Sequence, residues 1–316
     1  MKKIYTIILC SIAFNASSQT YLQRNFQETI HGLTTIINIL KGKPGEYRYS
    51  TFGTGFFYHE YAEPTPQHPD GNINSIDSSL RKIWLVTNKH VLFGKENSER
   101  LKPPFPVAID FYLRKKVKNS NIPKWDTIRL KESELRSLTK LHKDSLTDVV
   151  AIDVTKYVLQ RLSRGDSLFY YGAVSKLNFP SPDMPITLNG FDIGVGQEVL
   201  SVGYPQNFYD TYNLFPTVKA GVIASKWKAL YNGNRYFLID SKLFPGSSGS
   251  IIVTTPANYG SNKGDFNYFN FLGIYSGEPF RDKKPVEFDD MTIIKRETYN
   301  IGIVWYYDLI EEIIKN

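Results

Sequence analysis

Short apolar runs, separated by polar, glycine-rich and proline-rich stretches, recur along most of the chain. The runs are rich in β-branched and aromatic residues, which is typical of β-strands. We expect strands at residues 34–40, 53–58, 83–87, 107–113, 127–130, 149–154, 198–203, 217–224, 235–239, 250–255, 269–275 and 301–305. Many short strands with few long helical periods predict an all-β sandwich or barrel.

Two helices are also expected. Residues 155–164 favour a brief helix, and the end of the chain favours a second one. Asp308 and Glu311 have the spacing of a capping box, in which Asp308 is the cap and Glu311 reaches back to it. The apolar face that we expect to close on the last strands consists of Leu309, Ile310, Ile313 and Ile314.

The segments between these elements suggest how the chain is divided. Residues 59–79 are rich in proline, asparagine, aspartate and serine and predict a long surface loop. Residues 175–185 contain three prolines and are the best candidate for a linker. We therefore expect one domain at residues 19–180 and a second at residues 181–316.

Residues 1–18 have the pattern of a secretory signal, with Lys2 and Lys3 before an apolar run and small residues before Gln19. The run is too short to cross a bilayer as a helix. We expect an exported protein, periplasmic or secreted, with no stable membrane span after signal removal. Cys10, the only cysteine, lies in this signal, so disulfides, cysteine catalysis and thiolate metal sites are excluded from the mature chain.

The charge of the chain argues against one class of partner. Lysine and arginine number 38 against 31 acidic residues, a formal net charge of +7, but the basic residues are scattered. Short clusters at residues 114–116 and 281–284 are more typical of solvated faces than of a nucleic-acid groove, which needs a basic stripe with aromatic platforms. We expect no nucleic-acid partner.

The segment 243–251 breaks two strand-like runs with a serine pair between two glycines. Glycine in a strand costs stability because it packs no side chain, so a tight turn that exposes the backbone would explain the break. If Ser248 is a nucleophile, the N–H groups of Gly246 and Ser248 can point at one spot beside its hydroxyl, as an oxyanion hole requires. On its own the motif is more typical of a flexible surface turn.

A serine nucleophile needs an adjacent base that a third group holds in place. Of five histidines, only His90 ends a strongly apolar strand and begins another apolar turn, which would place it at a rigid strand end. Asp148 starts the buried strand at residues 149–152 and is the candidate for the orienting carboxylate. Taken alone, His90 is more simply a structural histidine and Asp148 a turn cap. The order His90, Asp148, Ser248 along one chain is a more specific pattern than any of the three residues alone.

Several segments in a fixed order carry a resemblance that covers most of the chain. They are Gly53-Thr54-Gly55-Phe56, residues 85–91 around His90, residues 147–152 around Asp148, and residues 202–205, 221–223, 245–250 and 272–274. In these segments the chain resembles the trypsin-like (chymotrypsin-fold) serine peptidases, most closely the bacterial HtrA/DegP-like and glutamyl-endopeptidase-like members.

The resemblance implies two six-stranded antiparallel β-barrels, an active site between them and a C-terminal helix. It implies that Ser248 attacks the scissile carbonyl, that His90 takes and returns the proton, and that Asp148 fixes the imidazole tautomer. The N–H groups of Gly246 and Ser248 would hold the oxyanion. The partner would be a peptide or protein substrate, and no cofactor is implied. The pocket for the residue before the cut would be walled by Lys242, Tyr275, Ser276, Gly277, Glu278, Gly302 and Val304.

The chain departs from the family pattern at several positions. Ser250 and Ile251 stand where glycine and proline are usual, and Ser247 stands where animal digestive members carry an aspartate that binds a freed N-terminus. Activation by such a salt bridge is therefore not expected, nor is a PDZ domain after Asn316. The residue preference stays open, because Lys242 would attract an acidic side chain and Glu278 a basic one.

The sequence leaves two functions open. The first is an exported serine endopeptidase that works through an acyl-enzyme. The second is a catalytically silent module that binds extended peptides or a surface partner, as the insertions at residues 59–79 and 94–145 would suit. A metal site from His59, Glu60 and His68 is disfavoured, because zinc needs ligands on rigid elements and these residues are expected in a loop.

Overall fold

The structure is a computed structural model, and it describes residues 26–43, 45–61, 80–116, 123–163, 168–180, 193–206, 208–259, 266–282, 285–288, 291–293 and 296–316. The predicted signal at residues 1–18 lies outside these ranges, as do residues 62–79 of the predicted loop and the linker beyond residue 180. Among the described residues, no helix has the length and apolar character needed to cross a membrane.

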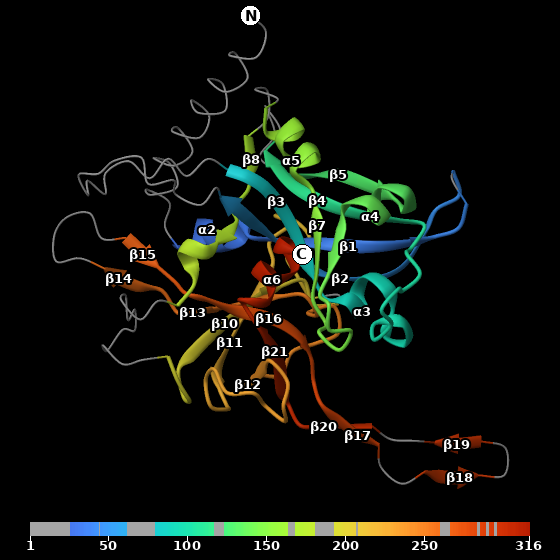
Figure 1. Cartoon of the computed structure of the whole chain (residues 1–316), viewed down its shortest axis with the longest axis vertical. Helices are drawn as coiled ribbons and strands as arrows, with labels where there is room; N and C mark the ends of the chain where they lie inside the picture. Colours follow the sequence, from blue (N-terminus) through green and yellow to red (C-terminus); the bar gives the residue numbers. More distant parts are fainter. Residues whose placement is uncertain are drawn as a thin grey trace, which may run out of the picture.

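Nine strands of the first half form one sheet, drawn from blue to green in Figure 1. They are β1 (Thr34–Lys41), β2 (Arg48–Tyr61), β3 (Leu80–Thr87), β4 (Ala108–Lys116), β5 (Lys124–Lys131), β6 (Thr139–Leu141), β7 (Val150–Asp153), β8 (Leu168–Tyr170) and β9 (Val174–Ser175). The order is β5-β4-β1-β2-β3-β7-β6, with β8 paired to β4 and β9 paired to β2. The helical segments of this half are α2 (Phe26–Gly32), α3 (Lys89–Phe93), η1 (Lys95–Asn97), α4 (Glu132–Leu138), α5 (Thr155–Leu162) and η2 (Lys176–Asn178).

Six strands of the second half close into a barrel in the order β10-β11-β12-β21-β16-β13. They are β10 (Glu198–Gly203), β11 (Thr217–Ile223), β12 (Tyr236–Asp240), β13 (Ile251–Thr254), β16 (Phe271–Gly277) and β21 (Ile301–Tyr306), and helix α6 (Leu309–Lys315) follows the last. Three two-stranded ladders pair β14 (Ala257–Tyr259) with β15 (Phe266–Tyr268), β17 (Phe280–Asp282) with β20 (Arg296–Thr298), and β18 (Val286–Phe288) with β19 (Met291–Ile293). The last two ladders extend away from the barrel (Figure 1).

The predicted all-β class and the C-terminal helix are confirmed, and every strand expected from the apolar runs is present. The second half closes with six strands as expected, whereas the first half has nine. The additional strands β6, β8 and β9 have only two or three residues. They exist because a neighbouring strand offers a ladder to pair with, and pairings of two or three residues are too short for a strand pattern in the sequence to predict them.

The burial of the strands follows from their places in the sheet. In β5, Ile128 and Leu130 are buried while Arg129 and Lys131 are exposed, the alternation of a strand with one face on the core. Strand β1 lies between β2 and β4 and is buried along most of its length. Because this central strand is buried, residues 34–40 are mostly apolar, and the sequence predicted the strand from that run.

Three clusters of buried apolar side chains make up most of the core. One fills the first half and another fills the barrel. The third joins both halves, since it contains Trp84 from β3, Ile251 from β13 and the four apolar residues of α6. Figure 1 shows α6 at the junction between the sheet and the barrel. This shared cluster fixes the two halves relative to each other.

The predicted capping box of α6 does not form. Asp308 precedes the helix but makes no side-chain bond to its backbone, and its carboxylate lies 3.0 Å from Arg235 Nη2. Glu311 instead accepts a hydrogen bond from the hydroxyl of Tyr58 and lies 3.2 Å from Lys176 Nζ. Both carboxylates therefore bond residues from distant parts of the chain, and neither caps the helix.

We expect Ile310→Ala to lower the free energy of unfolding by about 2 to 5 kcal/mol, because the change removes fully buried atoms and leaves a cavity in the shared cluster. Denaturant unfolding measures the loss. Leu230→Ala, at a side chain that is 61% exposed, is the control and should change stability by less than about 0.5 kcal/mol. A comparably small effect of both changes would contradict the packing of α6.

Candidate active site

The segment from Phe244 to Ser247 forms a tight turn. The Ser247 N–H donates to the Phe244 carbonyl at 3.0 Å, and Gly246, the third residue of the turn, has a φ of 89°. A turn with this bond and a positive φ at the third position is of type II, for which proline is favoured at the second position and glycine at the third. The dipeptide Pro245-Gly246 therefore specifies this turn locally.

A second tight turn follows at once and presents Ser248. The Ser250 N–H donates to the Ser247 carbonyl at 2.9 Å, and Gly249 has a φ of 87°. A Cβ atom on Gly249 would lie 1.9 Å from the carbonyl oxygen of Thr54, so no other residue fits there. Both glycines of the motif are thus required by the backbone, one by its φ and the other by its φ and its close contact.

Two backbone N–H groups in these turns are free. Neither the Gly246 N–H nor the Ser248 N–H has a hydrogen-bond acceptor among the residues that the structure describes. The Pro245 carbonyl accepts a bond from the Gln206 N–H at 2.7 Å, and in a trans peptide the Gly246 N–H points the opposite way. Among the described residues, these two backbone donors of the turn are therefore left without an acceptor.

His90 and Asp148 form a closely bonded pair. Strand β3 ends at Thr87, and His90 is the second residue of α3. Its backbone N–H lies 2.9 Å from Asp148 Oδ1, and its ring Nδ1 lies 2.6 Å from Asp148 Oδ2. Because a carboxylate only accepts hydrogen bonds, Nδ1 carries the proton of this bond, which leaves Nε2 for another partner.

Ser276 connects this pair to Ser248. Its hydroxyl donates to Asp148 Oδ2 at 2.6 Å, and its carbonyl accepts from the Ser248 hydroxyl at 2.9 Å. The sequence suggested only a place in a substrate pocket for Ser276. Among the described residues, the Ser248 hydroxyl makes this bond to Ser276 and none to His90.

Strand β2 lies beside both halves of the candidate site. The Thr54 N–H donates to the Ser248 carbonyl at 2.9 Å. A Cβ on the preceding Gly53 would lie 2.7 Å from a methyl of Val91 and 3.3 Å from the Ser248 carbonyl oxygen. Since Val91 follows His90 directly, the fold brings His90, Asp148 and Ser248 to one place although they belong to distant segments.

The residues predicted to wall a substrate pocket come from three segments that meet in the barrel. They are Lys242, Tyr275 to Glu278, and Gly302 to Val304, and β16 pairs with β21. Glu278 Oε1 accepts from the Leu243 N–H at 3.1 Å, and a Cβ on Gly302 would lie 2.8 Å from the Tyr275 ring. Burial, together with the Glu278 carboxylate, raises the pKa of Tyr275. Their role in binding substrate stays a prediction.

Three polar residues before His90 support the site and were given no such role from the sequence. Thr87, Asn88 and Lys89 are all almost completely buried. The Asn88 side chain donates to the Asp148 carbonyl at 2.8 Å, and Lys89 Nζ donates to the Ser145 carbonyl at 2.7 Å. Burial lowers the pKa of Lys89 against the opposing effect of the Asp148 charge. The signal in the sequence that predicts their burial is the apolar run of β3 that leads into them.

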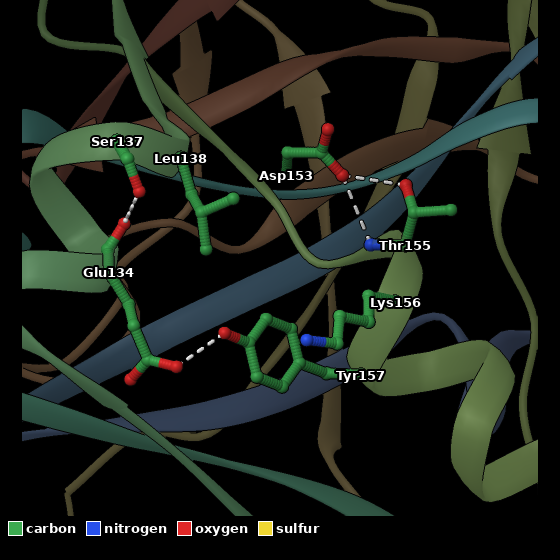
Figure 2. Close-up of a pocket in the computed structure, with 7 residues that line it drawn as sticks. All are labelled: Glu134, Ser137, Leu138, Asp153, Thr155, Lys156 and Tyr157. Atoms are coloured by element: carbon green, nitrogen blue, oxygen red, sulfur yellow. Dashed lines mark hydrogen bonds between the residues drawn. The ribbon is translucent and has the colours of Figure 1, made fainter.

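A separate hollow of about 410 Å³ lies beside helices α4 and α5 (Figure 2). Its lining consists of Glu134, Ser137, Leu138, Asp153, Thr155, Lys156 and Tyr157. The Tyr157 hydroxyl donates to Glu134 at 2.5 Å, and Thr155 donates to Asp153 from both its N–H and its hydroxyl. Bonds from Tyr157 and from the Lys131 N–H lower the pKa of Glu134. No histidine lines this hollow, and its carboxylates already have partners.

The prediction that His59 lies in a loop is wrong, because His59 lies in strand β2. Its Nδ1 is 3.1 Å from the Tyr61 hydroxyl and its Nε2 is 2.7 Å from the Tyr171 hydroxyl, while Glu60 accepts from the Trp84 indole. His68 lies outside the described residues. Within the described ranges, no three histidine, cysteine or acidic side chains gather as metal ligands would.

One comparison with known proteins identifies a family. A family model described as the trypsin-like peptidase domain matches residues 53–258, which include His90, Asp148 and Ser248. The comparison with curated proteins gives no match.

Burial lowers the pKa of His59 from 6.5 to about 4. Between these values the unfolded chain binds a proton that the folded protein refuses, so stability should fall as the pH drops from about 6.5 to 4. We expect this residue to contribute about 1 to 3 kcal/mol to that fall. Denaturant unfolding at pH 7 and pH 4.5 measures it, and His59→Phe, which cannot titrate, should show a shallower loss. An identical loss in both proteins would contradict the burial of a neutral imidazole.

Proposed function

The chain belongs to the family of trypsin-like peptidase domains, and we propose that it is an exported serine endopeptidase that hydrolyses peptide bonds through an acyl-enzyme. The single observation that carries the proposal is the Asp148 carboxylate, which bonds both the backbone and the ring of His90 while Ser276 connects it to Ser248. A base held in this way is what a serine hydroxyl needs in order to attack a carbonyl.

In the proposed first step, the Ser248 oxygen attacks the carbonyl carbon of the scissile bond and its proton passes to His90 Nε2. Asp148 holds the Nδ1 proton, which keeps Nε2 available and stabilises the imidazolium that forms. The intermediate then collapses, the C–N bond breaks, and the leaving amine takes the proton from Nε2. A water molecule, deprotonated by His90, hydrolyses the ester on Ser248 by the same steps.

The free N–H groups of Gly246 and Ser248 are the proposed oxyanion hole. Negative charge develops on the carbonyl oxygen during attack, and donors fixed beforehand stabilise that charge without reorganising. Two N–H groups that have no acceptor among the described residues, in a turn whose shape glycines dictate, are suited to this role.

The direction of the Ser248 hydroxyl defines a resting state. It donates to the Ser276 carbonyl, so catalysis requires a rotation about the Cα–Cβ bond that exchanges this acceptor for His90 Nε2. Such bonds are often poorly aligned in the absence of substrate and tighten on binding. The proposed substrate is an extended peptide or protein that triggers this exchange.

Finer assignments extend the proposal. Within the family, we place the chain nearest the bacterial HtrA/DegP-like and glutamyl-endopeptidase-like members, on the strength of Thr87-Asn88 before Lys89-His90 and of the Gly249-Ser250 pair. Export rests on the signal pattern of residues 1–18. Residues 19–180 and 181–316 are the proposed domains, with the site between them.

One observation favours the second candidate function, a silent module that binds extended peptides. The Ser248 hydroxyl bonds Ser276 and not His90, as it would in a protein that holds a peptide without cutting it. Digestion of unfolded casein by the wild type, absent in Ser248→Ala, would exclude this second function.

We expect the folded protein to react covalently with an alkyl fluorophosphonate at Ser248, because only an activated serine attacks this reagent at a useful rate. Ser248→Ala and His90→Ala should both lose labelling, and casein digestion should fall at least about 10³-fold in each. Mass spectrometry of the labelled peptide identifies the site.

Ser247→Ala is the matched control for this experiment, because it removes the neighbouring hydroxyl of the same segment. It should keep its label on Ser248. A folded wild-type protein that takes no label, or a label that survives in Ser248→Ala, would refute the proposal.

A further inference from the structure

Thr54 holds the nucleophile segment from the opposite half of the molecule. The side chain is fully buried in β2. Its hydroxyl donates to the Gly246 carbonyl at 2.9 Å and accepts from the Tyr204 N–H at 2.9 Å. Its backbone N–H donates to the Ser248 carbonyl at 2.9 Å, and its own carbonyl accepts from the Thr87 hydroxyl at 2.7 Å. Every polar atom of Thr54 is therefore used, and two of its bonds reach the turns around Ser248.

The direction of the Thr54 hydroxyl is determined by chemistry. A hydroxyl has one proton to donate, and the Tyr204 N–H can only donate. The proton of the Thr54 hydroxyl therefore lies toward the Gly246 carbonyl, the acceptor that the hydroxyl contacts. This bond orients the peptide between Gly246 and Ser247.

A second bond orients the peptide on the other side of Gly246. The Gln206 N–H donates to the Pro245 carbonyl at 2.7 Å. Pro245 and Gly246 favour the type II turn, but its internal bond, from the Ser247 N–H to the Phe244 carbonyl, leaves the carbonyls of Pro245 and Gly246 without a local partner. The bonds from Gln206 and Thr54 hold these two carbonyls and so fix the peptides on either side of Gly246.

We propose that Thr54 is a positioning residue that keeps the two N–H groups of the oxyanion hole in place before substrate arrives. The inference rests on the proposed peptidase function of the same site and adds the device that orders it. It also explains why a buried hydroxyl lies in β2, where an apolar side chain would otherwise pack. Thr54 does not touch the reacting atoms, since it acts through Gly246 and Ser248.

The test compares Thr54→Val with Thr54→Ser. Valine keeps the shape of the side chain and loses the hydroxyl, whereas serine keeps the hydroxyl. Thr35→Val is the matched control, because Thr35 is also fully buried in the same sheet and its hydroxyl likewise donates to a carbonyl and accepts an N–H, both of Tyr112. Thr35 makes no bond to the turns at residues 244–250.

Two measurements are made on each folded variant. The first is the reaction with an alkyl fluorophosphonate, which separates the maximal rate of labelling from the concentration that gives half of it. Displaced oxyanion donors slow the chemical step by orders of magnitude, so in Thr54→Val the maximal rate should fall about 10- to 100-fold. The half-saturating concentration should stay within about twofold, because ground-state binding does not use these donors.

The second measurement is amide hydrogen exchange of the peptide that spans residues 244–250. It should be faster in Thr54→Val than in the wild type, and unchanged in Thr54→Ser and in Thr35→Val. Thr54→Ser should also restore the labelling rate to within about threefold of the wild type. If Thr54→Val does not fold, Thr54→Ala replaces it with the same expectations.

Three results would overturn the proposal: a folded Thr54→Val protein with wild-type labelling rate and exchange, a Thr54→Ser protein as slow as Thr54→Val, or a Thr35→Val protein equally slow. Failure of the proposed function has a different signature. In that case the wild type takes no label, while the exchange of residues 244–250 still decides whether Thr54 orders the turn.

Discussion

The close contact between Gly249 and Thr54 is the constraint on which the candidate site depends. The carbonyl of Thr54 occupies the space where any larger residue at position 249 would place its Cβ atom. This contact lets the Thr54 N–H reach the Ser248 carbonyl, so the two halves of the protein are joined by a backbone hydrogen bond at the proposed nucleophile. Strand β2 pairs with β1 at Thr54 and with β3 from Phe56 onward, and this pairing makes the strand a rigid support for the turn.

The Asp148 carboxylate connects several residues of the same region through hydrogen bonds. It accepts three hydrogen bonds, from the His90 backbone, the His90 ring and the Ser276 hydroxyl. Together these three hydrogen bonds fix the orientation of the carboxylate. The loop before Asp148 is itself anchored, because the buried ammonium of Lys89 bonds the Ser145 carbonyl.

The shared core cluster explains how three distant segments meet with the accuracy that such bonds need. It contains Val86, Val149 and Ile251, which lie within a few residues of Thr87, Asp148 and Ser250 respectively. The side chains that join the halves thus belong to the same strand ends that carry the candidate site. Packing of α6 against this cluster stabilises the arrangement from the side of the C-terminus.

The sequence by itself determined the features that depend on neighbouring residues: the main strands from their apolar runs, and the turn around Gly246 from proline and glycine geometry. The short strands β6, β8 and β9 and the partners of Asp308 and Glu311 escaped it, since pairing with distant residues decides both. The same limit applies within the site. The bond from Ser276 to Asp148 joins residues 128 positions apart, and that from Thr54 to Gly246 joins residues 192 positions apart. Only the tertiary structure decided these pairings, because a hydroxyl bonds whichever acceptor the packing of two sheets brings within 3 Å, and no local pattern records that choice.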